Sequence, residues 1–306
     1  MGNWMKLSMP SFYLIKLISW SRFKMEKQSY IDALNWAFLI LKKQQQDPEI
    51  AQYLLLELTG WNLTKLTLHQ QELMQADLQQ QYQKAIQLAA AGVPPQYILG
   101  NAWFYGRQFK VTSDTLIPRQ DSEAMIAQIL QDSPAANSLL ELGTGSGALI
   151  ITLGLKGKYS QLTATDISAA ALQIAQENSH RHHVAINFLL GDLFEPVTNQ
   201  QFDIIVFNPP YIADNEIDLM DQSVLDFEPH QALFASENGL AFYRQIFQQA
   251  PGFLTPKGKI YLEFGFQQRG KISKMFQEQL PDWQIEFFND LANHPRFLRI
   301  QRKEVK

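Results

Sequence analysis

The sequence has no cysteine among its 306 residues. This absence excludes a disulfide scaffold, thiol catalysis and any site in which cysteine binds zinc or an iron–sulfur cluster. No apolar run reaches the roughly 18–20 residues needed to cross a bilayer. The net charge is only −4, so the chain lacks the basic excess typical of proteins that bind nucleic-acid phosphates. We therefore expect a cytoplasmic globular protein, and the length indicates two domains.

Residues 1–24 differ in composition from the rest of the chain. They carry Lys6, Lys16, Arg22 and Lys24 without a single acid, and Lys16 interrupts the apolar stretch that a secretory signal would need. We interpret this segment as an N-terminal extension of unclear role, which an upstream start, with Met25 as the true first residue, would explain. The alternative is a short basic amphipathic anchor.

The next two segments have contrasting patterns. Apolar residues at three- and four-residue steps predict a helical domain over residues 25–95, which we assign to substrate recognition. Short apolar runs with glycines follow over residues 96–120 and predict a hairpin-like linker, with β-type runs at 97–100, 103–106 and 109–111. Pro-Gln-Tyr-Ile-Leu-Gly opens this linker at Pro95.

Residues 121–306 alternate short apolar runs with helical patterns, which predicts an α/β domain built on a mostly parallel sheet. The final strand is expected to be antiparallel because only 289–295 separates it from its predecessor. The seven predicted strands are Ser138–Leu142, Leu162–Asp166, Ile186–Leu190, Asp203–Phe207, Lys259–Phe264, Gln284–Phe288 and Phe297–Gln301.

A glycine-rich loop follows the first of these strands. In Glu141–Gly147 the glycines permit a tight turn and close approach to a ligand, and the next helix presents free N–H groups there. The loop alone is ambiguous, because it also satisfies a dinucleotide-binding pattern. Asp166 ends the following strand, where a carboxylate can accept both hydroxyls of a ribose, and Asp192 follows the third strand.

Asn208-Pro209-Pro210-Tyr211 ends the fourth predicted strand. The carboxyl ends of the strands form the usual ligand site in open α/β sheets, so this tetrapeptide is expected in the crevice of the glycine loop. The Asn208 side-chain carbonyl and the Pro209 backbone carbonyl form a stiff pair of acceptors beside the Tyr211 ring. Two such acceptors match a planar –NH2 group, and they could orient its nitrogen towards an electrophilic methyl.

With these motifs the chain resembles the PrmC/HemK family of class I S-adenosylmethionine-dependent methyltransferases. The similarity covers nearly the whole chain from Met25. It rests on the helical N-terminal region, the loop and tetrapeptide above, and four further segments: Pro95–Gly100, Leu116–Arg119, Phe227–Pro229 and Leu262–Gly265. The resemblance implies a seven-stranded Rossmann-like sheet joined by a β-hairpin linker to a small all-helical domain.

The resemblance also implies an activity, a cofactor and a site. The family methylates the side-chain nitrogen, N5, of the Gly-Gly-Gln glutamine in class I peptide chain release factors, converting S-adenosylmethionine to S-adenosylhomocysteine. We therefore expect release factors as partners, with no membrane and no metal. The resemblance assigns substrate contacts to Phe104, Asn208, Pro209, Pro210 and Tyr211, and the last four of these are also expected to be catalytic. It assigns cofactor contacts to Glu141, Gly143, Thr144, Gly145, Ser146, Gly147, Asp166, Ile167, Asp192 and Leu193.

Two segments depart from the family pattern. Gln120-Asp121-Ser122 replaces the family's Pro-Glu-Thr, and Asn293-His294-Pro295 lacks the usual glycine before Arg296. We expect neither to remove a catalytic group. The alternatives are a nucleic-acid amino-methyltransferase acting on adenine or cytosine, a ribosomal-protein glutamine methyltransferase and a non-catalytic cofactor-binding scaffold. The histidines His180, His182 and His183 are expected in a solvated loop, because no carboxylate cluster accompanies them.

Overall fold

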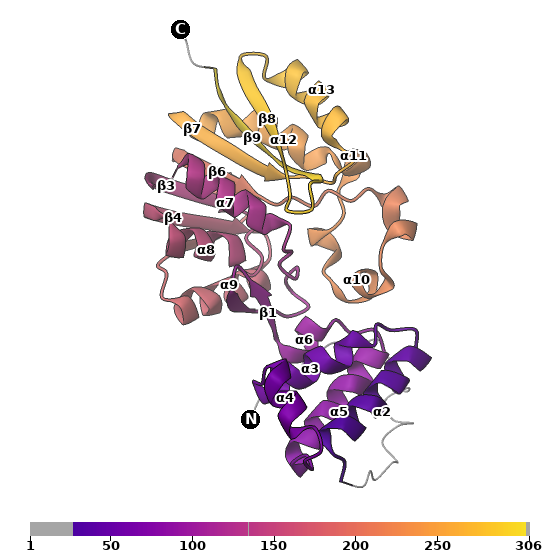
Figure 1. Ribbon diagram of the computed structural model, residues 1–306. Coiled ribbons are helices and arrows are strands. Elements are labelled where there is room, and N and C mark those ends of the chain that lie inside the picture. Colours follow the sequence, from indigo (N-terminus) through magenta and orange to yellow (C-terminus); the bar gives the residue numbers. More distant parts are fainter. Residues whose placement is uncertain (1–26, 134, 304–306) are drawn as a thin grey trace. The chain divides into compact units, whose positions relative to one another are not determined.

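The computed structural model describes residues 27–133 and 135–303, which form two compact units (Figure 1). The first unit comprises residues 27–100 together with Gln222–Phe227, and the second comprises Asn101–Asp221 and the chain from Glu228 onward. The basic extension over residues 1–24 lies outside the described residues, so its role and the domain boundaries expected near it stay predictions. Each unit is described by itself.

The first unit is helical, and the sequence explains where its helices begin and end. The Ser29 hydroxyl accepts the Asp32 N–H at the start of the first helix, and Gly60, in the left-handed conformation, ends the second. The core includes Leu54 and Tyr82, both fully buried. The helices are α2 (Tyr30–Lys43), α3 (Glu49–Thr59), α4 (Leu63–His69), α5 (Ala76–Ala90), α6 (Pro95–Leu99) and α10 (Gln222–Phe227).

One expectation for this region is wrong. The β-type run predicted at 97–100 is the short helix α6. Pro95 stands in its first turn, where the missing N–H of proline removes no hydrogen bond, and Gly100 ends it with φ +71°. The side chains of Tyr97 and Ile98 are apolar and buried, and in the sequence such a run resembles a strand. The proline and the glycine on either side of it favour a helix.

The second unit begins with an antiparallel hairpin of β1 (Asn101–Phe104) and β2 (Arg107–Lys110), as predicted. Among the described residues its main sheet has seven strands in the order β5-β4-β3-β6-β7-β9-β8. β9 pairs antiparallel with both β7 and β8, whereas the other neighbouring strands of this sheet pair parallel, which confirms the prediction for the final strand. The strands are β3 (Ala135–Leu142), β4 (Lys158–Asp166), β5 (Asn187–Leu190), β6 (Phe202–Phe207), β7 (Leu254–Glu263), β8 (Trp283–Asn289) and β9 (Pro295–Arg302).

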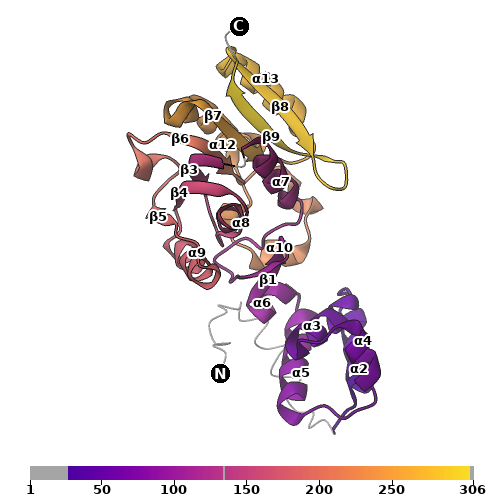
Figure 2. The ribbon, with the colours of Figure 1, turned by 60° about the vertical axis from the view of Figure 1, so that its left-hand side comes forward.

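Helices cover both faces of this sheet, so its central strands are apolar on both sides. Leu139 and Ile204 face a core that includes α7 and α8, whereas their neighbours Leu140 and Ile205 face a core that includes α12 and α13. Figure 2 shows the sheet between these layers. The helices are α7 (Ser122–Asp132), α8 (Ala148–Lys156), α9 (Ala169–His182), α11 (Ser236–Gly239), α12 (Ala241–Gln249) and α13 (Arg269–Gln279), with 3₁₀ turns η1 (Glu195–Val197), η2 (Asp214–Leu219), η3 (His230–Ala232) and η4 (Ala250–Phe253).

The histidine segment is also placed differently from the expectation. His180 and His182 lie in the last turn of α9, and only His183 follows it. His182 is half-buried: its ring packs on Phe109 and its Nε2 lies 2.9 Å from the Gln108 carbonyl. It therefore joins the hairpin to the sheet domain rather than lying in solvent.

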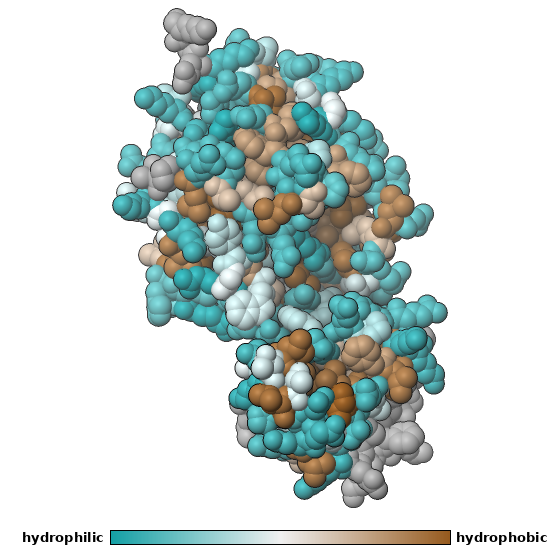
Figure 3. Space-filling view, in the orientation of Figure 1, coloured by the Kyte–Doolittle hydropathy of each residue, from teal (hydrophilic) through white to brown (hydrophobic). Residues whose placement is uncertain are grey.

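The exposed face in Figure 3 is mostly polar, with small groups of apolar residues between charged ones. In the part of the chain that the structure describes, no helix is both long and apolar enough to cross a membrane. The same residues contain no group of three or more histidine, aspartate or glutamate side chains arranged to hold a metal ion.

Candidate active site

A cavity of about 380 Å³ lies in the second unit, where the parallel strands end. Its wall includes the loop after β3, the residues after β4, β5 and β6, the segment Asp114–Arg119, and parts of η3 and α12. The crossover of the chain between β3 and β6 leaves an opening at this edge of the sheet, which is where open α/β folds bind ligands. The volume is that of a small-molecule site.

The glycine loop has the geometry that its sequence predicts. Gly143, Gly145 and Gly147 all have positive φ, between +56° and +79°. A Cβ at Gly143 would stand 3.0 Å from the Phe207 ring, and one at Gly147 would stand 3.0 Å from Ile151. These positions require glycine for both conformation and space. Gly143, Thr144, Gly145 and Ser146 line the cavity, whereas Gly147 lies behind it as the N-cap of α8.

Glu141 is buried beneath the loop, with 2% of its surface exposed. Its carboxyl accepts the Thr144 hydroxyl at 2.5 Å, and the residue also lines the cavity. Burial raises the pKa of this carboxyl to about 8, against the effect of the Thr144 hydrogen bond, and the nearby Asp166 adds to the rise. Glu141 therefore carries a proton at neutral pH and fixes the loop from below.

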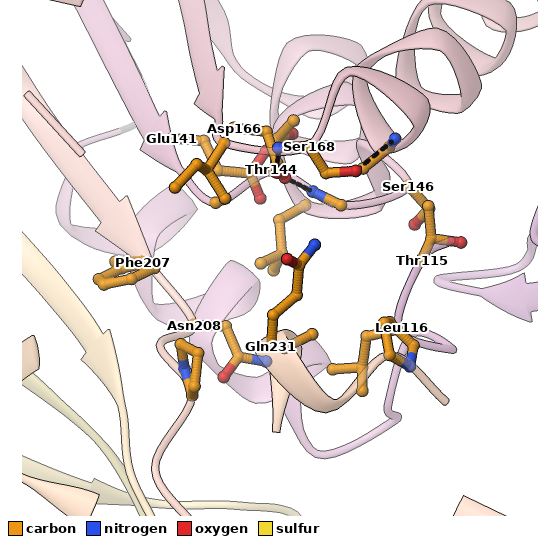
Figure 4. Close-up of a pocket in the computed structure, with 18 of the residues that line it drawn as sticks. Thr115, Leu116, Glu141, Thr144, Ser146, Asp166, Ser168, Phe207, Asn208 and Gln231 are labelled. Atoms are coloured by element: carbon orange, nitrogen blue, oxygen red, sulfur yellow. Dashed lines mark hydrogen bonds between the residues drawn. The ribbon is translucent and has the colours of Figure 1, made fainter. Parts of the chain in front are cut away.

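Asp166 joins the glycine loop to the end of β4. Its carboxylate accepts the N–H groups of Gly145 and Ser168, each at 2.8 Å (Figure 4). Burial raises the pKa of the Asp166 carboxyl, and the backbone N–H groups limit that rise. A carboxylate has about four acceptor positions, so two backbone bonds leave Asp166 able to accept from a ligand. Ile167, Asp192 and Leu193 line the cavity beside it.

The tetrapeptide after β6 contributes alternate residues to the cavity. Asn208 and Pro210 line it, whereas Pro209 and Tyr211 are not among its lining residues. Successive side chains of an extended segment point to opposite sides, and a proline biases the preceding residue to extended geometry. The structure therefore brings the Asn208 amide to the glycine loop's cavity. Burial raises the pKa of the Tyr211 hydroxyl, and the negative charge of Glu263 adds to that rise, whereas the positive charges of Arg296 and Arg119 limit it.

Several lining residues were not predicted from the sequence. Gln231, on η3, points its carboxamide into the cavity between Asn208 and the glycine loop (Figure 4). Arg119 lines the same cavity, and its guanidinium pairs at 2.5 Å with the buried Glu228, which also accepts the Ile117 N–H. This pair joins two segments that carry the family resemblance. No local sequence pattern identifies Gln231 as a site residue, because it lies on a turn that is distant in sequence from the glycine loop and reaches the cavity only in the folded chain. Phe104 of β1, which was predicted, also lines the cavity.

The fold and this cavity define a methyltransferase of the α/β type. A sequence profile described as the methyltransferase small domain matches residues 120–226, and one described as the PrmC N-terminal domain matches residues 32–100. Among solved structures, the hMettl16 catalytic domain in complex with the MAT2A 3′UTR hairpin 1 has a TM-score of 0.54 at 13% identity, covering 79% of this chain and 84% of that one. That identity shows the fold alone.

The particular family follows from closer relatives. The release factor glutamine methyltransferase of Enterococcus faecalis is 36% identical over 268 residues, which are 87% of this chain and 97% of that protein. The protein of the same name from Staphylococcus aureus is 32% identical, over 88% of this chain and 98% of its own length. The chain belongs to the release factor glutamine methyltransferase family, which confirms the resemblance noted in the sequence.

Proposed function

We propose that this chain transfers a methyl group from S-adenosylmethionine to the side-chain amide nitrogen of a glutamine in class I peptide chain release factors. The observation that carries the proposal is one cavity with the glycine loop and Asp166 at one end and Asn208 and Pro210 at the other. This arrangement offers contacts for both the methyl donor and an amide acceptor.

The residues present fit S-adenosylmethionine. Free N–H groups where the loop enters α8 suit the carboxylate of its methionine part. Asp166 keeps acceptor positions for ribose hydroxyls, and the exposed apolar side chain of Ile167 offers a surface for the adenine ring. Glu141 lines the cavity, so we assign it to cofactor contact as well as to support of the loop, whereas Gly147 supports the loop as the N-cap of α8. When bound, the cofactor supplies an electrophilic methyl group on a sulfonium sulfur.

Asn208 and Pro209 hold the acceptor in this proposal. The nitrogen of a carboxamide is a poor nucleophile because its lone pair is delocalised, and two acceptors on its N–H groups can fix its orientation. The same acceptors stabilise positive charge that develops on nitrogen, after which the surplus proton leaves to water. Tyr211 follows this acceptor pair after Pro210, and we assign it to holding the pair in place.

The substrate assignment rests on the relatives' names and on the family pattern. The Gly-Gly-Gln glutamine of class I release factors is the expected acceptor, with S-adenosylhomocysteine as product. We assign the helical unit, residues 25–95 with the linker 96–120, to recognition of that partner. Because release factors act with the ribosome, we place the activity in the cytoplasm. Direct contact with nucleic acid, a metal or a membrane has no role in this reaction.

The test is incubation of the full-length chain with methyl-labelled S-adenosylmethionine and a purified class I release factor. The expected result is label on one glutamine, located by mass spectrometry, and none on a release factor whose Gly-Gly-Gln glutamine is changed to alanine. Parallel reactions contain DNA, RNA or ribosomal proteins. Label on one of these substrates and not on the release factor would contradict the proposal.

A further inference from the structure

One buried asparagine binds both the glycine loop and the hairpin. Asn178 lies in α9 and is fully buried. Its Nδ2 donates to the Ser146 carbonyl in the glycine loop and to the Lys110 carbonyl in β2, each at 2.9 Å. Its Oδ1 accepts the Lys110 backbone N–H at 2.7 Å. A carboxamide has two donor hydrogens, so Asn178 uses one on the loop and one on the hairpin.

On the loop side, Asn178 fixes the peptide between Ser146 and Gly147. The carbonyl of this peptide accepts from Asn178, and its N–H donates to the Thr144 carbonyl at 2.9 Å. Gly147 also packs closely on α9, because a Cβ at this position would stand 3.2 Å from the Ala175 Cβ. Ser146 lines the cavity, so the position of a cavity-lining peptide depends on α9.

On the hairpin side, the carboxamide binds the backbone of β2 as a neighbouring strand would. It offers one acceptor and one donor to the same residue, Lys110. The adjacent Phe109 is fully buried, and its ring packs edge-on against that of Phe104, with the ring centroids 6.2 Å apart. Phe104 lines the cavity from β1. Asn178 therefore holds the strand that supports Phe104.

These hydrogen bonds lie where water cannot replace them, because Asn178 is fully buried and Ser146 is only 4% exposed. Leucine has a similar size but no polar atoms, so it would leave the Ser146 carbonyl and both backbone groups of Lys110 without this partner. Unpaired buried polar groups are costly, so the loop and the hairpin would move to new partners. A ligand of the loop would then have to restore its position on binding, and its affinity would fall.

We propose that Asn178 is a positioning residue for both sides of the cavity: one carboxamide sets the glycine loop that receives the cofactor and the hairpin that carries Phe104. The inference rests on the proposed function, because the ligand of the loop is taken to be S-adenosylmethionine and Phe104 is assigned to the methyl acceptor. It adds a physical link between the two sites. Asn178 itself is not among the residues that line the cavity, so it acts through the backbone that it binds.

The chain offers a matched control on the same helix. Ser179 is 7% exposed, and its hydroxyl donates to the carbonyl of Val184, which lies outside the cavity. Ser179→Ala should therefore destabilise the end of α9 without moving the loop or the hairpin. Asn178→Leu removes all three hydrogen bonds. Asn178→Asp introduces a buried carboxyl with a raised pKa, which can donate a hydrogen bond to one of the two carbonyls only when it is protonated.

Calorimetry measures the affinity of each folded variant for S-adenosylhomocysteine. We expect this affinity to fall about 10- to 100-fold in Asn178→Leu, as for the loss of a buried hydrogen-bond partner, and to stay within about twofold of the wild type in Ser179→Ala. The KM for a release factor should rise in Asn178→Leu as well. In Asn178→Asp the affinity relative to the wild type should recover as the pH falls from about 8 to about 6, because the protonated carboxyl regains a donor.

A second measurement needs no ligand. Hydrogen–deuterium exchange should rise in Asn178→Leu over residues 107–111 and over residues 143–151, and over neither segment in Ser179→Ala. A rise over only one segment, or wild-type affinity in Asn178→Leu, would overturn the inference. If Asn178→Leu does not fold, the pH profile of Asn178→Asp decides, and a flat profile overturns the inference. A wild-type chain that binds S-adenosylhomocysteine but methylates no release factor would overturn the proposed function instead, while the exchange and affinity data would still decide the role of Asn178.

Discussion

Glu141→Gln tests whether a protonated carboxyl supports the glycine loop. Burial raises the Glu141 pKa from 4.5 to about 8. At about 1.4 kcal/mol for each unit, this rise corresponds to a difference of about 5 kcal/mol between the protonated and ionised forms, an upper bound because the site can relax. Glutamine has nearly the same shape as protonated glutamate and does not ionise.

The direction of the effect follows from the raised pKa. A carboxyl that is harder to ionise in the folded state contributes its full stability below its unfolded pKa of 4.5, and that contribution is lost as the pH rises towards about 8. The free energy of unfolding of the wild type should therefore fall relative to that of Glu141→Gln between about pH 5 and pH 8. The expected relative change is several kcal/mol.

The assay is urea denaturation at several pH values across this window, in the absence of cofactor. It measures the unfolding transition of the second unit. The control is Glu195→Gln, because Glu195 is an exposed carboxylate in η1. If Glu141→Gln and the wild type showed the same pH dependence, Glu141 would be ionised in the folded protein and our account of the loop would be wrong.

Three further variants test other parts of the structure. Gly147→Ala should lower stability by about 1–3 kcal/mol, because φ is +79° and the new Cβ would crowd Ile151; thermal unfolding measures this, and unchanged stability would contradict the loop geometry. Asp166→Asn should weaken S-adenosylhomocysteine binding at least about tenfold, because Gly145 and Ser168 donate to different carboxylate oxygens and the new –NH2 group would face one of these donors; calorimetry giving wild-type affinity would refute this. In the helical unit, Tyr82→Phe removes the bond to the Ala51 carbonyl at 3.0 Å and should cost about 1 kcal/mol, with kcat unchanged once the chain is folded.

The sheet could be predicted from the sequence because its strands are apolar on both faces and bounded by turn residues. Runs such as Asp203–Phe207 are too short to form a helix of the usual length. Each predicted strand is present in the structure, and its ends lie within a few residues of the predicted ends. The short run at 97–100 could not be assigned by the same reasoning. Five residues give too little periodicity, and the decisive signals are Pro95 and Gly100 at its ends.

The glycine loop and Asp166 were also predictable, because a local motif fixes the backbone and the fold fixes where the strand ends. The contacts around Tyr211 were not. Gln268, whose side chain donates to the Tyr211 carbonyl, is 57 positions further along the chain, and the two residues meet because β6 and β7 lie side by side in the sheet. The departures at 120–122 and 293–295 looked like unrelated drift in the sequence. In the structure, Asp121 and Asp290, which lies in the turn between β8 and β9, both pair with the guanidinium of Arg296.

Asn208→Ala tests the central claim most directly, because it removes one of the two proposed acceptors and leaves the glycine loop intact. The measurement is the single-turnover rate of methyl transfer to the Gly-Gly-Gln glutamine of a class I release factor, with saturating S-adenosylmethionine. Our account predicts a fall of about 100-fold or more, with S-adenosylhomocysteine affinity within about twofold of the wild type. Transfer at the wild-type rate would contradict it.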